Sequence, residues 1–251
     1  MNALEFRHVT KRFDERTALD DVSLAIPRRS IVGLVGRNGS GKTTLLHHVT
    51  GMVLPTSGSC LTFGTPSGRL GAGELARIGM TQQHETLIPG MTVRQLLRYV
   101  ASFHTRWDNA LERQLLDAFD VDPGAKVGTL SPGLRQKVSL IVATGHHPEL
   151  LLLDEPLSDL DPYGRREVLG SLLERFRDDE TTIVISSHLL HDIEPVIDRV
   201  LCLDAGRVVA FAELDELKEQ HGQALNLEQL FLALTRREPV GALAHGGGAR
   251  P

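Results

Sequence analysis

The chain has 251 residues, of which 41% are apolar and 24% are charged, and its formal net charge is −5. This length fits one large α/β domain, or one domain with a smaller lobe. The acidic balance excludes an overall basic field for nucleic acid or anionic lipid. No apolar run approaches the roughly 18 residues of a membrane-spanning helix, so we expect that the chain does not enter the membrane by itself.

The first third of the chain is predicted to form strands joined by tight turns. Apolar and polar residues alternate in the first two segments, whereas the third is almost wholly apolar, as in a strand covered on both faces. These strands are expected near residues 4–9, 22–26, 31–36 and 58–63. Cys60 and Cys202 have no CxxC or metal-ligand spacing, so we expect reduced thiols on strands of a cytosolic protein.

A phosphate-binding motif follows the third strand. Residues 36–43 read GRNGSGKT and match G-x-x-x-x-G-K-[ST] in full, directly before a predicted helix over about 42–50. Backbone N–H groups at such a helix start bind anions, Lys42 can reach the β- and γ-phosphates, and Thr43 can ligate Mg²⁺. The predicted nucleotide-binding residues are Gly36, Arg37, Asn38, Gly39, Ser40, Gly41, Lys42, Thr43 and Thr44. A glycine-rich turn with a surface lysine is the weaker alternative.

Residues from about 92 to 144 show helical periodicity and are predicted to form an insertion between two strand-rich parts. The apolar positions are Val93, Leu96, Leu97 and Val100, then Leu111, Leu115 and Phe119, then Leu134, Val138, Ile141 and Val142. Thr92 and Asp108 are the expected caps of the first two helices. In the segment LSPGLRQK, Ser131 is the expected N-cap of the third helix and Pro132 its first residue.

Two carboxylates follow the buried strand predicted over residues 150–154. Asp154 is expected to hold the hydration shell of Mg²⁺, and Glu155 to polarise a water. A plain acidic exit from the strand is the alternative. A helix near 168–176, a buried strand near 181–188 and a hairpin turning at residues 205–206 are predicted to follow.

The order and spacing of these motifs resemble the ATP-binding-cassette (ABC) ATPases over roughly residues 4–234. The resemblance implies that Phe13 stacks on adenine, a simple core aromatic being the alternative. It also implies that Gln83, chosen over its neighbour Gln82, touches the metal and the attacking water. His188 matches the switch histidine of the family, which contacts the γ-phosphate.

Two further motifs carry the resemblance. LSPGLRQK lies where the family has its signature, whose commonest form is L-S-G-G-Q, and it keeps Ser131 and Gly133 but has Pro132 in place of a glycine. LSDLDP resembles the D-loop, with Asp161 as its closing aspartate. The histidines at positions 47, 48, 146, 147 and 191 show no metal-site spacing, and we expect each on a helix surface.

The resemblance implies an α/β P-loop NTPase core with a mixed sheet, an N-terminal antiparallel β-subdomain and an inserted helical subdomain. One cassette would span 1–237, with a catalytic core over about 1–83 and 146–215, a helical subdomain over about 84–145 and a C-terminal helical segment over 216–237. Residues 238–251 are rich in Gly and Ala without periodicity, so we expect a disordered tail.

The resemblance further implies that two cassettes enclose two ATP molecules head to tail. Ser131 and Gly133 of one subunit would then face the phosphates held by the other, and Thr43, Gln83 and Asp154 would hold Mg²⁺. The expected partners are a second ABC ATPase, identical or not, and an integral membrane permease, with no nucleic acid. The chain would therefore lie in the cytoplasm, peripheral on the inner face of the cell membrane.

Within the family, the compact bacterial exporter-type (ABC-2-like) ATPases are the most similar group. The segments FHTRWD and LNLEQLFLAL resemble that group, and the chain leaves no room for the extra C-terminal domain of many importers. We therefore predict an ATPase that energises an exporter. The alternatives are a soluble ABC ATPase of translation or DNA maintenance, and a regulatory module that holds ATP without hydrolysing it.

Overall fold

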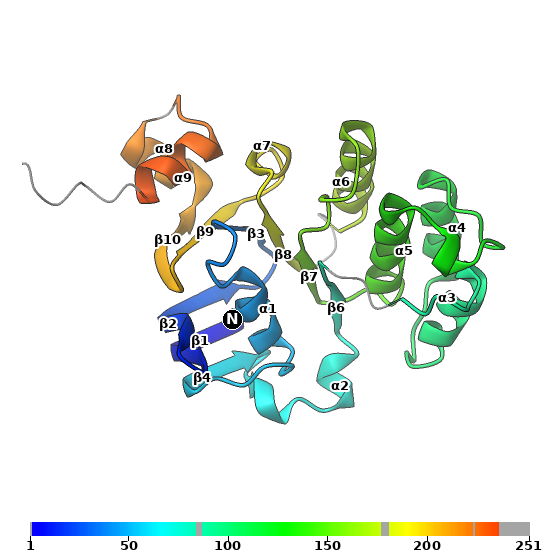
Figure 1. The fold of residues 1–251 in the computed structure, drawn as a ribbon, viewed down its shortest axis with the longest axis horizontal. Coiled ribbons are helices and arrows are strands. Elements are labelled where there is room, and N and C mark those ends of the chain that lie inside the picture. The colour runs from blue at the N-terminus through cyan, green and yellow to red at the C-terminus, as the bar shows by residue number, and fades with distance from the viewer. Residues whose placement is uncertain (1, 84–86, 177–180, 223, 236–251) are drawn as a thin grey trace, which may run out of the picture.

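The computed structural model describes residues 2–83, 87–176, 181–222 and 224–235. Two sheets lie against each other around helix α1 (Lys42–Val49), and a group of helices extends from the far edge of the larger sheet (Figure 1). The predicted fold class is confirmed, because an antiparallel N-terminal sheet packs beside a mixed sheet with helices. The predicted tail, 238–251, lies outside the described residues.

The N-terminal sheet is antiparallel, in the order β2-β1-β4-β5. Its strands are β1 (Asn2–Phe13), β2 (Arg16–Pro27), β4 (Ser57–Thr62) and β5 (Thr65–Pro66). Its inward apolar side chains share one core with α1 and with one face of the larger sheet. Cys60 on β4 and Cys202 on a strand of the larger sheet are both buried and unbonded, as predicted.

The larger sheet has the order β10-β9-β3-β8-β7-β6 among the described residues. Its strands are β3 (Ile31–Val35), β6 (Ile78–Thr81), β7 (Leu150–Asp154), β8 (Thr182–Ser187), β9 (Arg199–Asp204) and β10 (Arg207–Glu213). All neighbours pair in parallel except β9 and β10, which form the predicted hairpin. Strands β3, β7 and β8 are buried along their whole length, which explains their continuous apolar sequences.

The helical group begins beyond β6. Its main helices are α3 (Val93–Ala101), α4 (Asn109–Ala118) and α5 (Pro132–Thr144), and the short 3₁₀-helix η2 (Val127–Thr129) precedes α5. The short helices η1 (Ser67–Arg69) and α2 (Ala72–Leu75) lie before β6 in the chain. The predicted caps are confirmed, because the side chains of Thr92, Asp108 and Ser131 each accept a backbone N–H of the first helical turn. Such caps satisfy N–H groups that the helix itself leaves unpaired.

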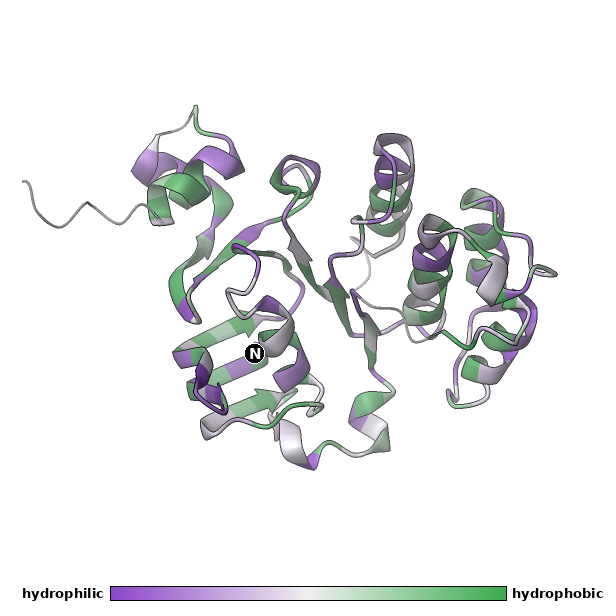
Figure 2. Cartoon of the chain, viewed as in Figure 1, coloured by the Kyte–Doolittle hydropathy of each residue, from purple (hydrophilic) through white to green (hydrophobic). Residues whose placement is uncertain are grey.

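The remaining helices are α6 (Pro162–Phe176), α7 (Leu190–Ile193), α8 (Leu214–His221) and α9 (Leu227–Thr235). Figure 2 shows α9 as mainly apolar and α8 as mainly polar. Glu194 joins them to α7, since it accepts the backbone N–H of Leu227 at 2.9 Å and pairs with Lys218 at 2.6 Å. None of the helices in the described part of the chain has the length and apolar character that a bilayer-spanning segment requires.

Candidate nucleotide-binding site

The phosphate-binding loop, Gln83, Asp154, Glu155 and His188 gather at one edge of the larger sheet because four parallel strands end there. Strand β3 runs into the phosphate-binding loop, and β7 ends at Asp154. His188 follows the last residue of β8, and Gln83 lies two residues after β6. Register brings Asp154 opposite Ser186 of the neighbouring strand. Ligand sites of parallel sheets form at this carboxyl edge.

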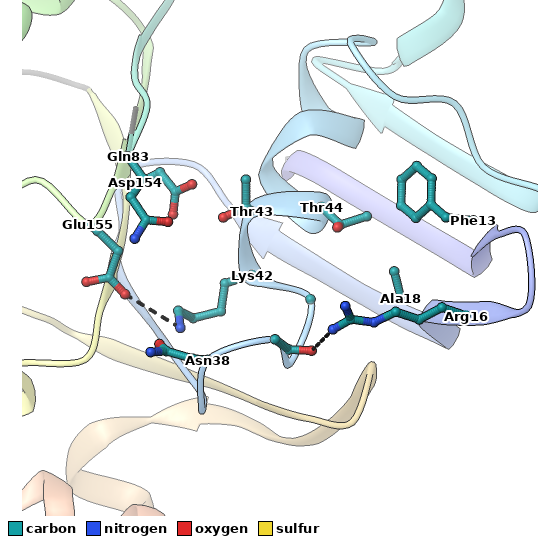
Figure 3. A pocket seen from close by; sticks show the side chains of 12 residues that line it. Phe13, Arg16, Ala18, Asn38, Lys42, Thr43, Thr44, Gln83, Asp154 and Glu155 are labelled. Atoms are coloured by element: carbon teal, nitrogen blue, oxygen red, sulfur yellow. Dashed lines mark hydrogen bonds and ion pairs between the residues drawn. The ribbon is translucent and has the colours of Figure 1, made fainter. Parts of the chain in front are cut away.

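A cavity of about 420 Å³ lies between this edge and the N-terminal sheet (Figure 3). It is lined by Phe13, Arg16, Ala18, Asn38, Gly39, Gly41, Lys42, Thr43, Thr44, Gln83, Asp154 and Glu155. Phe13 is 45% exposed, so the alternative that it is a core aromatic is wrong. Gln83 lies on the cavity, whereas Gln82 contacts the sulfur of Met52 and lines a different cavity.

The phosphate-binding loop has the conformation of an anion cradle. Gly41 has φ of +109°, and a Cβ there would lie 2.5 Å from the carbonyl oxygen of Ala18, so only glycine fits. Lys42 is buried, and its Nζ donates to the carbonyl of Gly36 at 2.9 Å, which holds the ammonium across the loop. The Ser40 hydroxyl is buried without a hydrogen-bond partner in the described structure.

Asp154 is fully buried and offers one free carboxylate oxygen. Its Oδ1 accepts the Ser186 hydroxyl at 2.5 Å, and its Oδ2 has no partner among the described residues. Thr43 and Gln83 add oxygen atoms to the same cavity. No group of three or more His, Cys, Asp or Glu in the described residues could hold a metal ion alone. The oxygens of Asp154, Thr43 and Gln83 on one cavity fit Mg²⁺, which binds one or two protein oxygens and completes its shell with phosphate and water.

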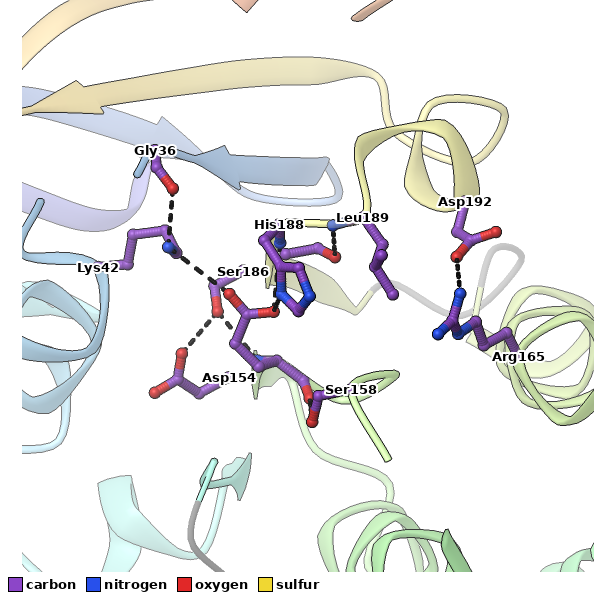
Figure 4. A network of polar contacts seen from close by, with 11 residues as sticks. Gly36, Lys42, Asp154, Ser158, Arg165, Ser186, His188, Leu189 and Asp192 are labelled. Carbon is purple, nitrogen blue, oxygen red and sulfur yellow. Dashed lines mark hydrogen bonds and ion pairs between the residues drawn. The ribbon is translucent and has the colours of Figure 1, made fainter. Parts of the chain in front are cut away.

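Glu155 contacts Lys42, Ser186 and His188, which are labelled in the polar network of Figure 4. Its φ of +49° is the left-handed region, which costs a residue other than glycine about 1 kcal/mol. One carboxylate oxygen lies 3.6 Å from the ammonium of Lys42, and the other lies 2.7 Å from Nδ1 of His188. The Glu155 backbone N–H donates to the hydroxyl of Ser186 at 3.0 Å. Each of the two neighbouring carboxylates thus has its own fixed direction.

Ser186 was missed in the sequence analysis, although its hydroxyl donates to the carboxylate of Asp154 and accepts the backbone N–H of Glu155. The signal was its place near the end of a buried strand, where a polar side chain needs a partner. Arg37, predicted to bind nucleotide, lies instead in a neighbouring cavity of about 370 Å³ that His188 and α9 also line. Gly36 lines that cavity too, while its carbonyl binds Lys42.

Ser131, Gly133 and Asp161 lie together on a third cavity, of about 520 Å³, which shares no lining residue with the nucleotide cavity. The Ser131 hydroxyl oxygen accepts the Leu134 N–H at 3.2 Å. Asp161 accepts the Gly164 N–H at 2.8 Å. A Cβ on Gly133 would lie 2.9 Å from the carbonyl oxygen of Asp159, so this glycine allows α5 to pack against the D-loop segment.

The prediction that every one of five histidines lies on a helix surface is wrong for His48 and His146, which are buried, and for His147, which follows α5 as a loop residue with φ of +52°. His48 is fully buried in α1, and its Nδ1 lies 2.7 Å from the carbonyl of Thr44. His146 is also buried, stacked on His104 with ring centroids 4.1 Å apart. Burial, and to a smaller extent the charge of His104, lowers the pKa of His146 to about 4. Neither His48 nor His146 lines the nucleotide cavity.

Comparison with known proteins agrees with this geometry. The family model described as ABC transporter matches residues 19–158. Daunorubicin resistance ATP-binding protein DrrA3 of Streptomyces coeruleorubidus is 35% identical, over 84% of this chain and 68% of that protein. Aliphatic sulfonates import ATP-binding protein SsuB 1 of Burkholderia cenocepacia is 36% identical, over 99% of this chain and 74% of that protein. The solved structure of an ATP-binding subunit of an ABC transporter is 27% identical, with a TM-score of 0.82, covering 93% of this chain and all of that one.

The fold and the cavity therefore define a P-loop ATPase, and the chain belongs to the ABC transporter family. Within that family it is an ATP-binding subunit, an ATPase whose turnover is coupled to transport.

Proposed function

We propose that this chain is the ATP-hydrolysing subunit of an exporter, peripheral on the inner face of the cell membrane. The observation that carries the ATPase mechanism is the meeting of the phosphate loop, Asp154 and Glu155 in one cavity. Export is supported by the resemblance of FHTRWD and LNLEQLFLAL to exporter-type ATPases, and by the relative named for daunorubicin resistance. Because another relative is named for sulfonate import, the direction of transport is the part of this proposal that needs a test.

ATP binds with its base on Phe13 and its phosphates in the loop. The exposed ring of Phe13 offers a stacking face, and Lys42 places a buried positive charge beside the loop carbonyls. Thr43, Asp154 and Gln83 would hold Mg²⁺, which neutralises charge on the phosphates when bound. The free Oδ2 of Asp154 is the oxygen available for it or for its water shell.

Glu155 orients and polarises the attacking water. Its carboxylate bonds both the ring and the backbone N–H of His188, so the two side chains move as a unit. His188 is 51% exposed at this surface and would contact the γ-phosphate. Binding of phosphate to Lys42 competes with the 3.6 Å contact to Glu155 and frees that carboxylate oxygen to accept a proton from water.

Each complete site requires a second subunit, identical or related. Ser131 and Gly133 lie at an exposed helix start, in a cavity separate from the nucleotide cavity of the same chain. Helix α5 has 13 residues, and the partial positive charge at its N-terminus favours phosphate. Head-to-tail pairing brings this surface and Asp161 of one subunit to the ATP of the other. Phosphate charge then holds the dimer closed, and product release reopens it.

A membrane permease docks beside Gln83. The neighbouring cavity, about 240 Å³, is lined by Met80, Gln82, Leu87, Ile88, Leu96, Tyr99, Val100, Ser139 and Val142. Tyr99 and Ile88 are exposed apolar groups on its rim. This surface is formed by β6, α3 and α5, and β6 leads into Gln83. A displacement of the helices relative to the sheet would therefore be transmitted to a partner docked on this surface.

A single substitution tests the ATPase mechanism. In Glu155→Gln the water loses its proton acceptor while the shape of the site is kept. We expect steady-state ATP hydrolysis to fall about 100-fold or more, with ATP binding retained. Glu219→Gln, on the exposed face of α8, is the matched control and should hydrolyse ATP at the native rate. Native turnover in Glu155→Gln would refute the role of Glu155.

The direction of transport is tested in cells that lack this protein. Loss of an exporter should lower resistance to cytotoxic amphiphiles such as daunorubicin, and the native chain, but not Glu155→Gln, should restore it. Co-purification of an integral membrane protein with the native chain identifies the permease. Unchanged resistance together with lost growth on an aliphatic sulfonate as sulfur source would assign an importer instead.

A further inference from the structure

Arg16 is a cationic side chain of the nucleotide cavity to which no sequence motif assigns a role. It is the first residue of β2, directly after the β1–β2 turn, and it lines the cavity together with Phe13 and Ala18. Figure 3 shows its guanidinium directed at the phosphate-binding loop from the side of the N-terminal sheet. Lys42 reaches the loop from the other side, next to Glu155.

The charge of Arg16 is not neutralised by any ion pair recorded for the described residues. Its contact there is a long hydrogen bond of 3.4 Å to the carbonyl oxygen of Gly39, in the middle of the phosphate-binding loop. The nearby cation Lys11 is engaged elsewhere, because its Nζ donates to the carbonyl of Leu54 at 2.9 Å and lies over the Phe13 ring. Lys42 is paired with Glu155.

The arrangement of the cavity fixes what such a cation meets. A nucleotide stacked on Phe13 with its phosphates in the loop must pass between the β1–β2 turn and residues 39–44. Arg16 stands at this passage and touches Gly39, so the polyphosphate comes within its reach. A guanidinium offers five donors in a planar fork that matches two phosphate oxygens. Its weak bond to one carbonyl is readily exchanged for charged oxygens.

We propose that Arg16 is a nucleotide-contacting residue that binds the polyphosphate of ATP from the side opposite Lys42. This inference rests on the proposed ATPase function. Because the contact is with phosphate charge, it grows from AMP to ATP and makes the site selective for the triphosphate. Arg16 and Lys42 together contact the phosphates from two sides. The N-terminal sheet thereby contacts the polyphosphate of the nucleotide as well as its base.

The test is nucleotide affinity of the full chain, measured by titration calorimetry with MgATP, MgADP and AMP. Arg16→Gln should weaken ATP binding about 10-fold or more, the worth of a charge-assisted hydrogen bond, and AMP binding much less. Arg16→Lys keeps the charge without the planar guanidinium, so its ATP affinity should lie between that of the native chain and that of Arg16→Gln. Arg12→Gln is the matched control, since it removes the same charge from an exposed residue of β1 that does not line the cavity.

Three outcomes would overturn the proposal. The first is an ATP affinity in Arg16→Gln within about twofold of that in Arg12→Gln. The second is an equal loss for ATP and AMP, which would place the guanidinium at the base or ribose. The third is an unfolded Arg16→Gln whose folded Arg16→Lys counterpart binds all three nucleotides natively. Failure of the native chain to bind ATP at all would instead refute the proposed ATPase function.

Discussion

The two adjacent carboxylates of Asp154 and Glu155 have different surroundings, which suit them to the different tasks proposed for them. Asp154 still belongs to β7, and the Ser186 hydroxyl binds one of its oxygens while the other stays free at the cavity. Glu155 has left the strand with φ of +49°, which turns its side chain toward His188 and Lys42. A change of backbone direction over one residue thus separates the carboxylate proposed to face the metal from the one proposed to face the water. Such strain at a non-glycine residue is a feature of functional sites.

His146 gives a pH dependence of stability that is independent of catalysis. Its folded pKa, about 4, lies below the ordinary value of 6.5 because burial and then the charge of His104 disfavour the imidazolium. Between these values the unfolded chain binds the proton and the folded chain does not, so stability falls as pH drops from about 6.5 to about 4. The loss contributed by His146 is at most about 3 kcal/mol.

The measurement is the melting temperature of the native chain and of His146→Gln from pH 7 to pH 5. The glutamine amide can still donate to the carbonyl of Ile78, which the ring Nε2 contacts at 3.2 Å, but it does not titrate. We expect a smaller drop in melting temperature in this variant. His221→Gln, at an exposed position, should follow the native chain. Parallel curves for the native chain and His146→Gln would show that His146 is not the group responsible.

At the scale of elements, the start of α5 has a structural task and, under the proposed mechanism, a functional one as well. Ser131 caps the helix and Pro132 is its first residue, where a missing N–H costs least. Proline nevertheless removes a donor that would face the phosphate of a partner subunit. Pro132→Gly restores that N–H, so we expect ATP-dependent dimers at about 10-fold lower ATP concentration. The melting temperature should fall, because glycine adds freedom to the unfolded chain.

Dimer formation at increasing ATP concentration, followed by light scattering in Glu155→Gln, measures this effect. Pro132→Ala is the matched control, because it restores the same N–H without the flexibility of glycine. Both variants should tighten the dimer if the donor is the cause. Tightening in Pro132→Gly alone would assign the effect to flexibility, and native behaviour of both would show that Pro132 does not limit the contact.

Elements with a strong local signal could be predicted from the sequence, and contacts between distant segments could not. Caps such as Thr92 and Asp108 depend on residues within one turn, and the confirmed strands have continuous or alternating apolar patterns. His48 lies on a helix packed among β2, β4 and β7, so all its faces are covered, which periodicity does not reveal. His146 is buried by His104, which comes from a different part of the chain.

The same limit applies to the candidate site. The phosphate loop and the two carboxylates could be found because each is contiguous in sequence. Ser186 and Arg16 lie at the site only because of strand pairing and the packing of one sheet on another. Their spacing from the motifs in the sequence therefore does not predict them. Arg37 shows the converse, since it lies within the motif but lines a different cavity. The motif predicts which residues form the backbone of the loop, whereas the side chains that face the nucleotide depend on the tertiary fold.

At the scale of the whole molecule, one chain carries two separate cavities, which the proposed function treats as the two halves of an ATP site. The nucleotide cavity lies between the two sheets, and the cavity of Ser131 and Asp161 lies between α5 and α6. A symmetric head-to-tail pair would join each half-site to its complement and create two equal sites. This arrangement explains why a helix start shaped for anions is presented on a surface away from the loop of its own chain.

Mixing two inactive variants tests this arrangement directly. Lys42→Ala removes the phosphate cation of one half-site, and Ser131→Arg blocks the other, so each variant alone should be inactive. In a mixed dimer one site carries both changes and the other carries neither. Random pairing makes half of the dimers mixed, each with one of two sites intact, so an equal mixture should recover about a quarter of native hydrolysis.

The control places both substitutions on one chain and mixes it with Glu155→Gln. In this mixed dimer, one site combines Lys42 and Glu155→Gln of one chain with Ser131→Arg of the other. The second site combines Lys42→Ala of the doubly substituted chain with the native Ser131 of its partner. Neither site is complete, so no activity should return. Recovery in the first mixture but not in the control requires that Lys42 of one chain work with Ser131 of another. Activity of either variant alone, or no recovery in the first mixture, would mean that each chain completes its own site.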